Sequence, residues 1–273
     1  MRRHPIRHVV LAAAALLWLS PLYFVVVNAG RPSEAWGDAP LWEPSASFVL
    51  FENMTEAWRL AELGKSIASS LLYASVGGVA AVLLAALAAF GIVVLRIRHG
   101  FAWFMLLYTG TVLPLQVFLT PLWELFQAYG LYDRRAGLLL LYTSIAIPFA
   151  VFVLRNFFGA IPTELREAAQ VDGASSWRIF WQIYIPLSWS ALASLFIFQF
   201  TWIWNDLLFG LTLSRSINIR PIMTALAALQ GGYSSTSTAL VLAGAVVVAL
   251  PMVALFLALQ RLFVEGLSLR VEG

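Results

Sequence analysis

Six long apolar runs constrain this chain more than any other feature of its sequence. They cover about residues 8–29, 67–95, 101–128, 136–158, 187–211 and 237–261. Each is near the roughly 20 residues that a helix needs to cross a bilayer. Runs this long and continuously apolar suit helices rather than the alternating strands of a membrane barrel. The sequence therefore predicts an all-α membrane protein with six transmembrane helices.

The composition supports this class and excludes several kinds of site. Hydrophobic residues make up 61% of the chain and charged residues 11%, which is outside the range of soluble proteins. There is no cysteine, so disulfides, thiolate nucleophiles and cysteine metal sites are excluded. His4, His8 and His99 are too scattered for a metal cluster, and the basic residues are spread over loops. We therefore predict neither a metal site nor a nucleic-acid partner.

The first apolar run follows Arg2, Arg3 and Arg7 and has two interpretations. A cleaved signal peptide is one, since Val27-Asn28-Ala29 resembles a cleavage site. An uncleaved first span is the better one, because the run is longer than a signal core and five more follow. The bias of basic residues towards the inner loops places both termini in the cytoplasm. No internal repeat or low-complexity linker is present, so residues 1–273 are predicted to form a single transmembrane domain.

The most informative polar stretch separates two of these runs, at residues 159–186. Thr163 is a candidate helix N-cap, which would put Glu164 in the favourable first turn. Gly173 is a predicted helix stop, because glycine readily adopts the left-handed turn that ends a helix. Ser175 can cap a second short helix. Two short helices joined at a glycine, between membrane spans, describe a docking element.

This stretch resembles the EAA loop of ABC-importer permeases, whose pattern is Glu-Ala-Ala, three residues, Gly, nine residues, Ile, one residue, Leu, Pro. The corresponding residues here are Glu167-Ala168-Ala169, Gly173, Ile183 and Ile185-Pro186, with Ile185 in place of leucine. Pro186 also marks the predicted entry into the next apolar run. An ordinary amphipathic loop helix is the alternative, but the length of the match argues against it.

In that family the loop fits a groove on the ATPase subunit, so the resemblance implies a docking surface here. The residues carried over by position, or adjoining the motif in the two short helices, are Glu164, Glu167, Ala168, Ala169, Gly173, Ala174, Ser175 and Trp177. Either Glu164 or Glu167 could make the decisive contact, and the spacing to Gly173 favours Glu167.

A second polar group lies at the end of the fifth run. Gln199, Trp202 and Asp206 are three and four residues apart, which predicts one shared helical face. Trp204-Asn205-Asp206 also resembles a Trp-Asn-Asp/Glu segment of sugar-importer permeases. Intramembrane polar groups usually face a bundle interior or an aqueous path, and these side chains suit a sugar. The alternative is an aromatic belt at the membrane interface with a snorkelling acid.

Gln116 and Glu124, in the third run, are further candidates for the same substrate pathway, with helix packing as the alternative. Nothing in the sequence supplies nucleotide chemistry. Gly64-Lys65-Ser66 echoes the end of a phosphate-binding loop, but Arg59 stands where its first glycine would be. No nucleophile elbow is present, and no histidine lies at membrane depth. We therefore expect no enzymatic activity and no cofactor bound by this chain.

The resemblance extends over most of the chain, through Phe157–Pro162 and the tail Gln260–Leu267. The chain resembles a type I ABC-importer permease with the MetI-like bundle, and looks closest to the MalG-like branch of carbohydrate-uptake permeases. The final residues, Leu269–Gly273, depart from the usual ending of that branch.

The resemblance implies inward sugar transport by alternating access in a bacterial or archaeal plasma membrane. It also implies a second, homologous but different permease, two ATPase subunits that use ATP and Mg, and an extracytoplasmic solute-binding protein. A non-sugar solute such as glycerol-3-phosphate or a polyol is the alternative cargo. A secondary transporter would need clustered intramembrane acids, which the sequence lacks, and a purely structural subunit would not need the loop.

Overall fold

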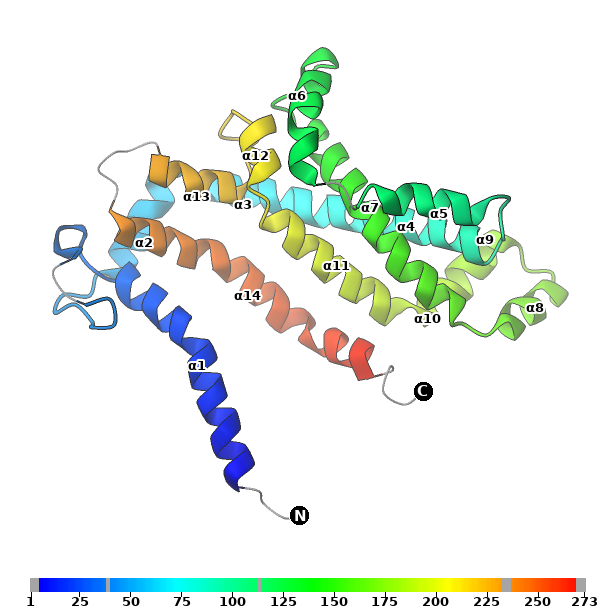
Figure 1. Ribbon diagram of the computed structural model, residues 1–273, viewed down its shortest axis with the longest axis horizontal. Helices are drawn as coiled ribbons and strands as arrows, with labels where there is room; N and C mark the ends of the chain where they lie inside the picture. Colours follow the sequence, from blue (N-terminus) through cyan, green and yellow to red (C-terminus); the bar gives the residue numbers. More distant parts are fainter. Residues whose placement is uncertain (1–4, 38–39, 112–113, 232–236, 269–273) are drawn as a thin grey trace. The chain divides into compact units, whose positions relative to one another are not determined.

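The computed structural model describes residues 5–37, 40–111, 114–231 and 237–268, and within these ranges it contains helices and no strand (Figure 1). Arg2, Arg3 and the atypical ending Leu269–Gly273 lie outside the described residues. In chain order, the helices and helical turns are α1 Pro5–Ala29, η1 Ser33–Ala35, α2 Leu50–Leu60, α3 Leu63–Leu72, η2 Tyr73–Gly77, α4 Gly78–Val93, α5 Gly100–Thr109, η3 Leu115–Phe118, α6 Leu119–Ala128, α7 Arg135–Gly159, α8 Thr163–Val171, α9 Ser176–Ile179, η4 Phe180–Tyr184, α10 Ile185–Leu187, α11 Trp189–Trp204, α12 Leu208–Leu213, α13 Ile222–Gly231 and α14 Thr238–Ser268.

Four of the predicted spans are confirmed as helices long and apolar enough to cross a membrane. They are Arg7–Ala29, Leu63–Val93, Arg135–Gly159 and Thr238–Gln260. A fifth candidate is the helix pair Ser176–Leu187 and Trp189–Trp204, which is bent by 76°. The described part of the chain is therefore an all-helical membrane protein with four or five candidate spans.

The span predicted at residues 101–128, whose Pro114 and Pro121 suggest kinks, is not one continuous helix in the structure. Helix α5 ends at Thr109, and the chain resumes as the short turn η3 and then α6. Pro114, which lacks a backbone N–H, has ψ 126° and starts this second part with extended backbone. Hydrophobicity alone could not show this break, because apolar residues continue through it.

The start of the predicted fifth span also needs correction. Pro186 does not mark entry into that span, because it lies inside a helical stretch that runs from Ser176 to Leu187. The bend comes at Ser188, whose backbone leaves the helical region. A π-helical turn, η4, lies within the same stretch and displaces its side chains from a regular helical register.

The described residues fall into two compact units, one containing those within 1–65 and 225–251 and the other those within 66–224 and 252–273. The prediction of a single domain stays a prediction. In the first unit, Arg31 is buried and donates hydrogen bonds to the carbonyl oxygens of Pro40 and Glu43. Asn53 of α2 donates to the carbonyl oxygens of Ala29 and Arg31, both at 2.8 Å. These bonds fix α2 to the end of α1.

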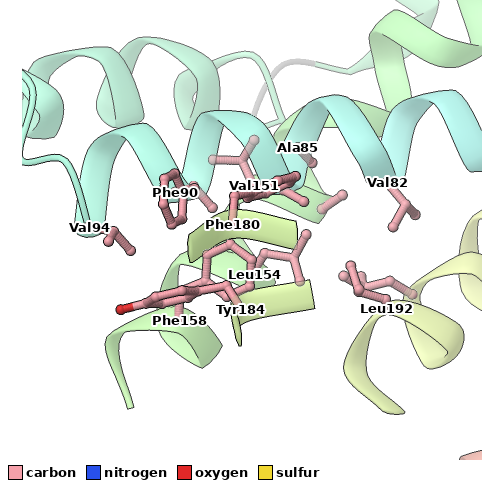
Figure 2. Close-up of a cluster of buried hydrophobic side chains, with 14 of the residues drawn as sticks. Val82, Ala85, Phe90, Val94, Val151, Leu154, Phe158, Phe180, Tyr184 and Leu192 are labelled. Carbon is pink, nitrogen blue, oxygen red and sulfur yellow. The ribbon is translucent and has the colours of Figure 1, made fainter. Parts of the chain in front are cut away.

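In the second unit, α4 packs most extensively against α7. Ala81, Ala85 and Ala89 of α4 are fully buried, and such small residues allow close approach of the partner backbone. Figure 2 shows the core where α4 and α7 meet the π-helical turn η4. Phe90 of α4 lies 5.2 Å, between ring centroids, from both Phe180 and Tyr184 of η4. The helical stretch after the polar loop is thus built into the core.

Asp133, in the turn before α7, joins this turn to the loop that follows α12. Its Oδ1 accepts hydrogen bonds from the backbone N–H groups of Arg215 and Ser216, both at 2.8 Å, and its Oδ2 accepts from the Ser216 hydroxyl. Partial burial alone would raise the pKa of this carboxyl, but the hydrogen bonds from Ser216 and Arg215 outweigh burial and lower it.

This arrangement predicts a pH-dependent contribution of Asp133 to stability. A lowered folded-state pKa means that the contribution is present above the unfolded-state pKa, about 3.9, and is lost as pH falls through the folded-state value. Asp133→Asn should therefore lower the melting temperature at pH 7 by about 2–4 °C, the equivalent of roughly 1 kcal/mol of hydrogen bonding.

The difference between Asp133→Asn and the wild type should shrink when melting is measured near pH 3. Asp172→Asn is the matched control, because Asp172 is exposed and its carboxyl accepts no hydrogen bond from the described residues. The assignment is wrong if the two variants show the same pH dependence.

Candidate functional site

The polar loop between α7 and α11 begins with helix α8, whose start differs from the prediction. Thr163 is the first helical residue, and Pro162 occupies the N-cap position with no side-chain cap. The prediction that Thr163 caps the helix is therefore wrong. Proline fits this position because its fixed φ suits the helix entry and no donor is lost from the helix. Glu164 lies in the first turn, as predicted.

The end of α8 confirms the predicted glycine stop. Gly173 has a φ of +76°, in the left-handed region. Its N–H donates to the Gln170 carbonyl at 3.0 Å, and the Ala174 N–H donates to the Ala169 carbonyl at 2.9 Å. These two bonds form a Schellman motif, which satisfies carbonyl groups that the helix end would leave open. Ala169 and Ala174, which this motif brings together, both pack against the core cluster.

The second helix of the loop starts as predicted. The Ser175 hydroxyl accepts a hydrogen bond from the Arg178 N–H at 3.3 Å and caps α9. Trp177 stacks on Phe180 of the core, with ring centroids 5.9 Å apart, and still keeps 61% of its surface exposed.

The loop has an inward side and an outward side. Ala169 and Ala174 face the core, while Glu164, Glu167 and Ala168 are exposed. Two further apolar side chains of α8, Leu165 and Val171, are also exposed, at 43% and 88%. The predicted docking residues therefore divide into those that hold the loop and those that a partner could reach.

Sequence reasoning missed the residue that holds α8 in place. Arg166 is largely buried, and its Nη1 donates to the carbonyl oxygen of Val94, just past the end of α4, at 3.0 Å. Its Nη2 lies 3.5 Å from a carboxylate oxygen of Glu167. No local pattern could reveal this anchor, because Val94 is far away in sequence.

The residues predicted to line a pathway lie around two cavities, both in the second unit. One, of about 450 Å³, is lined by Gln199 and Trp202 together with two polar groups that sequence reasoning missed, Thr111 and Ser144. Gln199 is buried, and its Nε2 donates to the Ala146 carbonyl at 3.0 Å. Most of the remaining lining is apolar, including a stacked pair formed by Phe149 and Phe198 with centroids 4.9 Å apart.

The second cavity, of about 650 Å³, is lined by Trp202, Asn205 and Asp206. Asp206 lies beyond the end of α11, so the predicted single helical face is wrong for this residue. Its Oδ2 accepts from the Tyr142 hydroxyl at 2.8 Å and from the Gly210 N–H at 3.0 Å, and its Oδ1 accepts from the Phe209 N–H at 3.3 Å. These bonds fix the start of α12 to α7.

The other two predicted pathway residues are not brought to these cavities. Gln116 lies in η3 and Glu124 in α6, both are exposed, and neither lines the two cavities described. The sequence could not place them, because the break between α5 and α6 changes the direction in which their segment runs. Their pathway role stays a prediction.

The family profile described as "Binding-protein-dependent transport system inner membrane component" matches residues 81–268 of this chain. The osmoprotective compounds uptake permease protein GgtD of Synechocystis sp. is 31% identical, covering 95% of this chain and 89% of the relative. The melibiose/raffinose/stachyose import permease protein MelC of Bacillus subtilis is 31% identical, covering 81% and 80%. Other relatives are named for α-glucoside, lactose and sn-glycerol-3-phosphate transport.

The fold is similar to a crystal structure of a bacterial ABC transporter involved in the import of the acidic polysaccharide alginate. The TM-score is 0.76 at 21% sequence identity, with 94% of each chain covered. The matching relatives are mostly carbohydrate-uptake permeases, as expected for the MalG-like branch. The chain belongs to the family of binding-protein-dependent transport system inner membrane components, as a multi-pass ABC-importer permease that is not itself catalytic.

Proposed function

We propose that this permease moves a sugar or oligosaccharide into the cell by alternating access, driven by ATPase subunits that dock on the loop at residues 159–186. The observation that carries the proposal is the two-sided construction of this loop. Its inner side is fixed by the Schellman motif at Gly173 and by the bond from Arg166 to α4. Its outer side offers Glu164, Glu167 and Trp177 to a partner.

A loop built in this way can transmit a movement of a docked partner to the helix bundle. A partner that presses on α8 and α9 moves residues that pack directly on the core shared by α4, α7 and η4 (Figure 2). Packed cores shift between discrete arrangements rather than deform continuously, so a small movement of a rigid loop can change the state of the bundle. Either glutamate could carry the contact, and Glu167 is our choice because of its spacing to Gly173.

The proposed assembly contains two ATPase subunits, which use ATP and Mg, an extracytoplasmic solute-binding protein and a second permease. A second permease is needed because this chain carries one docking loop, and we propose that it is a homologous but different chain. Both termini are proposed to lie in the cytoplasm of a bacterial or archaeal cell. The broken segment from α5 to α6 is proposed as the sixth crossing of a MetI-like bundle.

For the substrate path we propose the two cavities around Trp202. Trp202 offers a flat apolar face to a sugar ring, while Gln199, Ser144 and Asn205 supply groups that can bond hydroxyls. Asp206 contributes to this path mainly by holding its wall, since its carboxyl already accepts three hydrogen bonds. Gln116 and Glu124 remain candidates for an outer part of the path.

A non-sugar cargo such as a polyol or glycerol-3-phosphate is the second candidate. The relatives named for osmoprotective compounds and for sn-glycerol-3-phosphate favour it. A secondary transporter is less well supported, because the described residues contain no cluster of acids that could hold a coupling ion.

The decisive experiment is substrate-stimulated ATP hydrolysis by the complete transporter in proteoliposomes, with the cognate binding protein and a panel of sugars, polyols and glycerophosphate compounds. We expect stimulation by one or a few sugars and none by the other classes. Trp202→Ala should raise the sugar concentration needed for half-maximal transport, with Trp189→Ala, an exposed tryptophan outside both cavities, as the control. Stimulation only by a phosphorylated compound or polyol would reject the sugar assignment.

A further inference from the structure

A basic face lies where the C-terminal ends of α4 and α7 meet the start of α5. We define this basic face by Arg96 and Arg98 of the α4–α5 loop and Arg155 of α7. The sequence has no aspartate or glutamate from residue 63 to 123, nor from 134 to 163. The three helices that form this face therefore bring no carboxylate to it, and the acid that comes near it is Glu167 of the neighbouring loop, which lies 3.5 Å from Arg166.

Arg155 is positioned by packing rather than by an ion pair. Its guanidinium carbon lies 4.7 Å from the centroid of the Phe104 ring, a cation–π contact that holds the planar group on an aromatic surface. Phe104 in turn stacks on Tyr108 and Phe152, with ring centroids 5.8 and 6.4 Å away. The Arg155 Nε is buried and makes no hydrogen bond within the described residues. The edge of a guanidinium held in this way suits phosphate.

The α4–α5 loop alternates apolar and basic side chains on an exposed segment. Leu95 and Ile97 are 49% and 43% exposed, while Arg96 and Arg98 between and after them are also exposed. The next helix, α5, continues the pattern with exposed Phe101, Trp103 and Leu106. Figure 1 shows α5 lying beside α4 and α7, which agrees with their contacts. Basic groups next to exposed aromatic and aliphatic side chains are typical of a membrane interface.

We propose that the basic face binds the phosphate headgroup of an anionic phospholipid in the inner leaflet, with the acyl chains lying against the exposed apolar side of α5. Basic pockets at the inner ends of membrane helices attract such lipids, because the leaflet is negatively charged. The site adjoins Val94, whose carbonyl receives the Arg166 anchor, so the lipid would lie next to the attachment point of the docking loop.

The test is native mass spectrometry of the full chain in an uncharged detergent, titrated with dioleoylphosphatidylglycerol or dioleoylphosphatidylcholine. The wild type is expected to retain phosphatidylglycerol at lower lipid concentration than phosphatidylcholine. Each arginine removed should weaken phosphatidylglycerol binding about fivefold, the contribution of one basic residue near an anionic lipid surface. The double variant Arg96→Gln/Arg98→Gln should therefore lose about 25-fold.

Arg155→Gln should lose more than Arg155→Lys, which keeps the charge but not the planar group. The double variant keeps the test decisive if Arg155→Gln does not fold, since Arg96 and Arg98 are exposed. Arg134→Gln, an exposed arginine in the turn before α7, is the matched control and should bind like the wild type.

The proposal is overturned if the two lipids bind equally or if Arg134→Gln loses as much as the double variant. It is also overturned if inorganic phosphate displaces phosphatidylglycerol at a similar concentration, which would indicate a site for soluble anions. Loss of the lipid when the ATPase subunits assemble would overturn it too, because the face would then be an ATPase contact. The measurement needs no transport, so its failure is distinct from failure of the proposed function.

Discussion

Asp206→Ala is expected to destabilise this permease more than any other single truncation at the proposed substrate path. The change removes the acceptor of three hydrogen bonds, from Tyr142, Phe209 and Gly210. It leaves the Tyr142 hydroxyl orphaned on a side chain that is fully buried. At about 1–3 kcal/mol for each buried group left without a partner, we expect a loss of about 3–5 kcal/mol.

A double-mutant cycle isolates the Tyr142–Asp206 contact. Tyr142→Phe alone should cost about 1–2 kcal/mol, because the backbone donors still reach the Asp206 carboxyl. The double variant should cost less than the two single changes added together, since no hydroxyl is then left orphaned. Asn205→Ala, at the neighbouring exposed residue, should cost below about 1 kcal/mol. Unfolding followed by tryptophan fluorescence measures all four, and additive single costs would contradict the coupling.

Gly137→Ala is expected to lower stability although alanine normally favours helices. A Cβ on Gly137 would lie 2.3 Å from the carbonyl oxygen of Leu131 and 3.1 Å from the Phe126 ring. Because the nearer atom belongs to the backbone, no side-chain rotation can relieve the clash. An overpacking cost of about 1–3 kcal/mol predicts a melting temperature lower by roughly 3–10 °C.

Gly91→Ala is the control, because it makes the same change in helix α4 with no atom within 4 Å of the new methyl group. There the higher helix propensity of alanine should act alone and raise stability by up to about 1 kcal/mol. The two variants should therefore shift the melting temperature in opposite directions. A rise in both would show that the turn at Leu131 adapts freely.

Helix ends and caps were predictable from the sequence where they depend on contacts between residues a few positions apart. The Gly173 stop, the Ser175 cap and the position of Glu164 were predicted because each depends on the backbone of its own turn. The N-cap at Thr163 was wrong because the backbone enters the helix one residue earlier, at Pro162.

Features that depend on distant contacts could not be predicted. Arg166 reaches Val94 across 72 residues, and Tyr142 reaches Asp206 across 64. The break between α5 and α6 and the 76° bend at Ser188 were hidden by continuous hydrophobicity, which reports burial or lipid contact and not direction. The apolar pattern therefore predicted which segments are helical, but not how many of them are single straight helices long enough to span a membrane.

The central claim, that the loop at residues 159–186 couples ATP hydrolysis to transport, depends on the left-handed turn at Gly173. A new side chain there meets no atom within 4 Å, so substitution acts through the backbone alone. Valine strongly disfavours this conformation, whereas asparagine tolerates it. A cost of about 1–2 kcal/mol lowers the ratio of formed to unformed turn roughly 5- to 30-fold.

The most direct test is binding-protein-stimulated ATP hydrolysis by the assembled transporter carrying Gly173→Val or Gly173→Asn, at matched assembly with the ATPase subunits. We predict that Gly173→Asn keeps most of the stimulation and that Gly173→Val loses more of it, by up to the same factor of about 5- to 30-fold. Equal stimulation in the wild type, Gly173→Asn and Gly173→Val would contradict coupling through this loop.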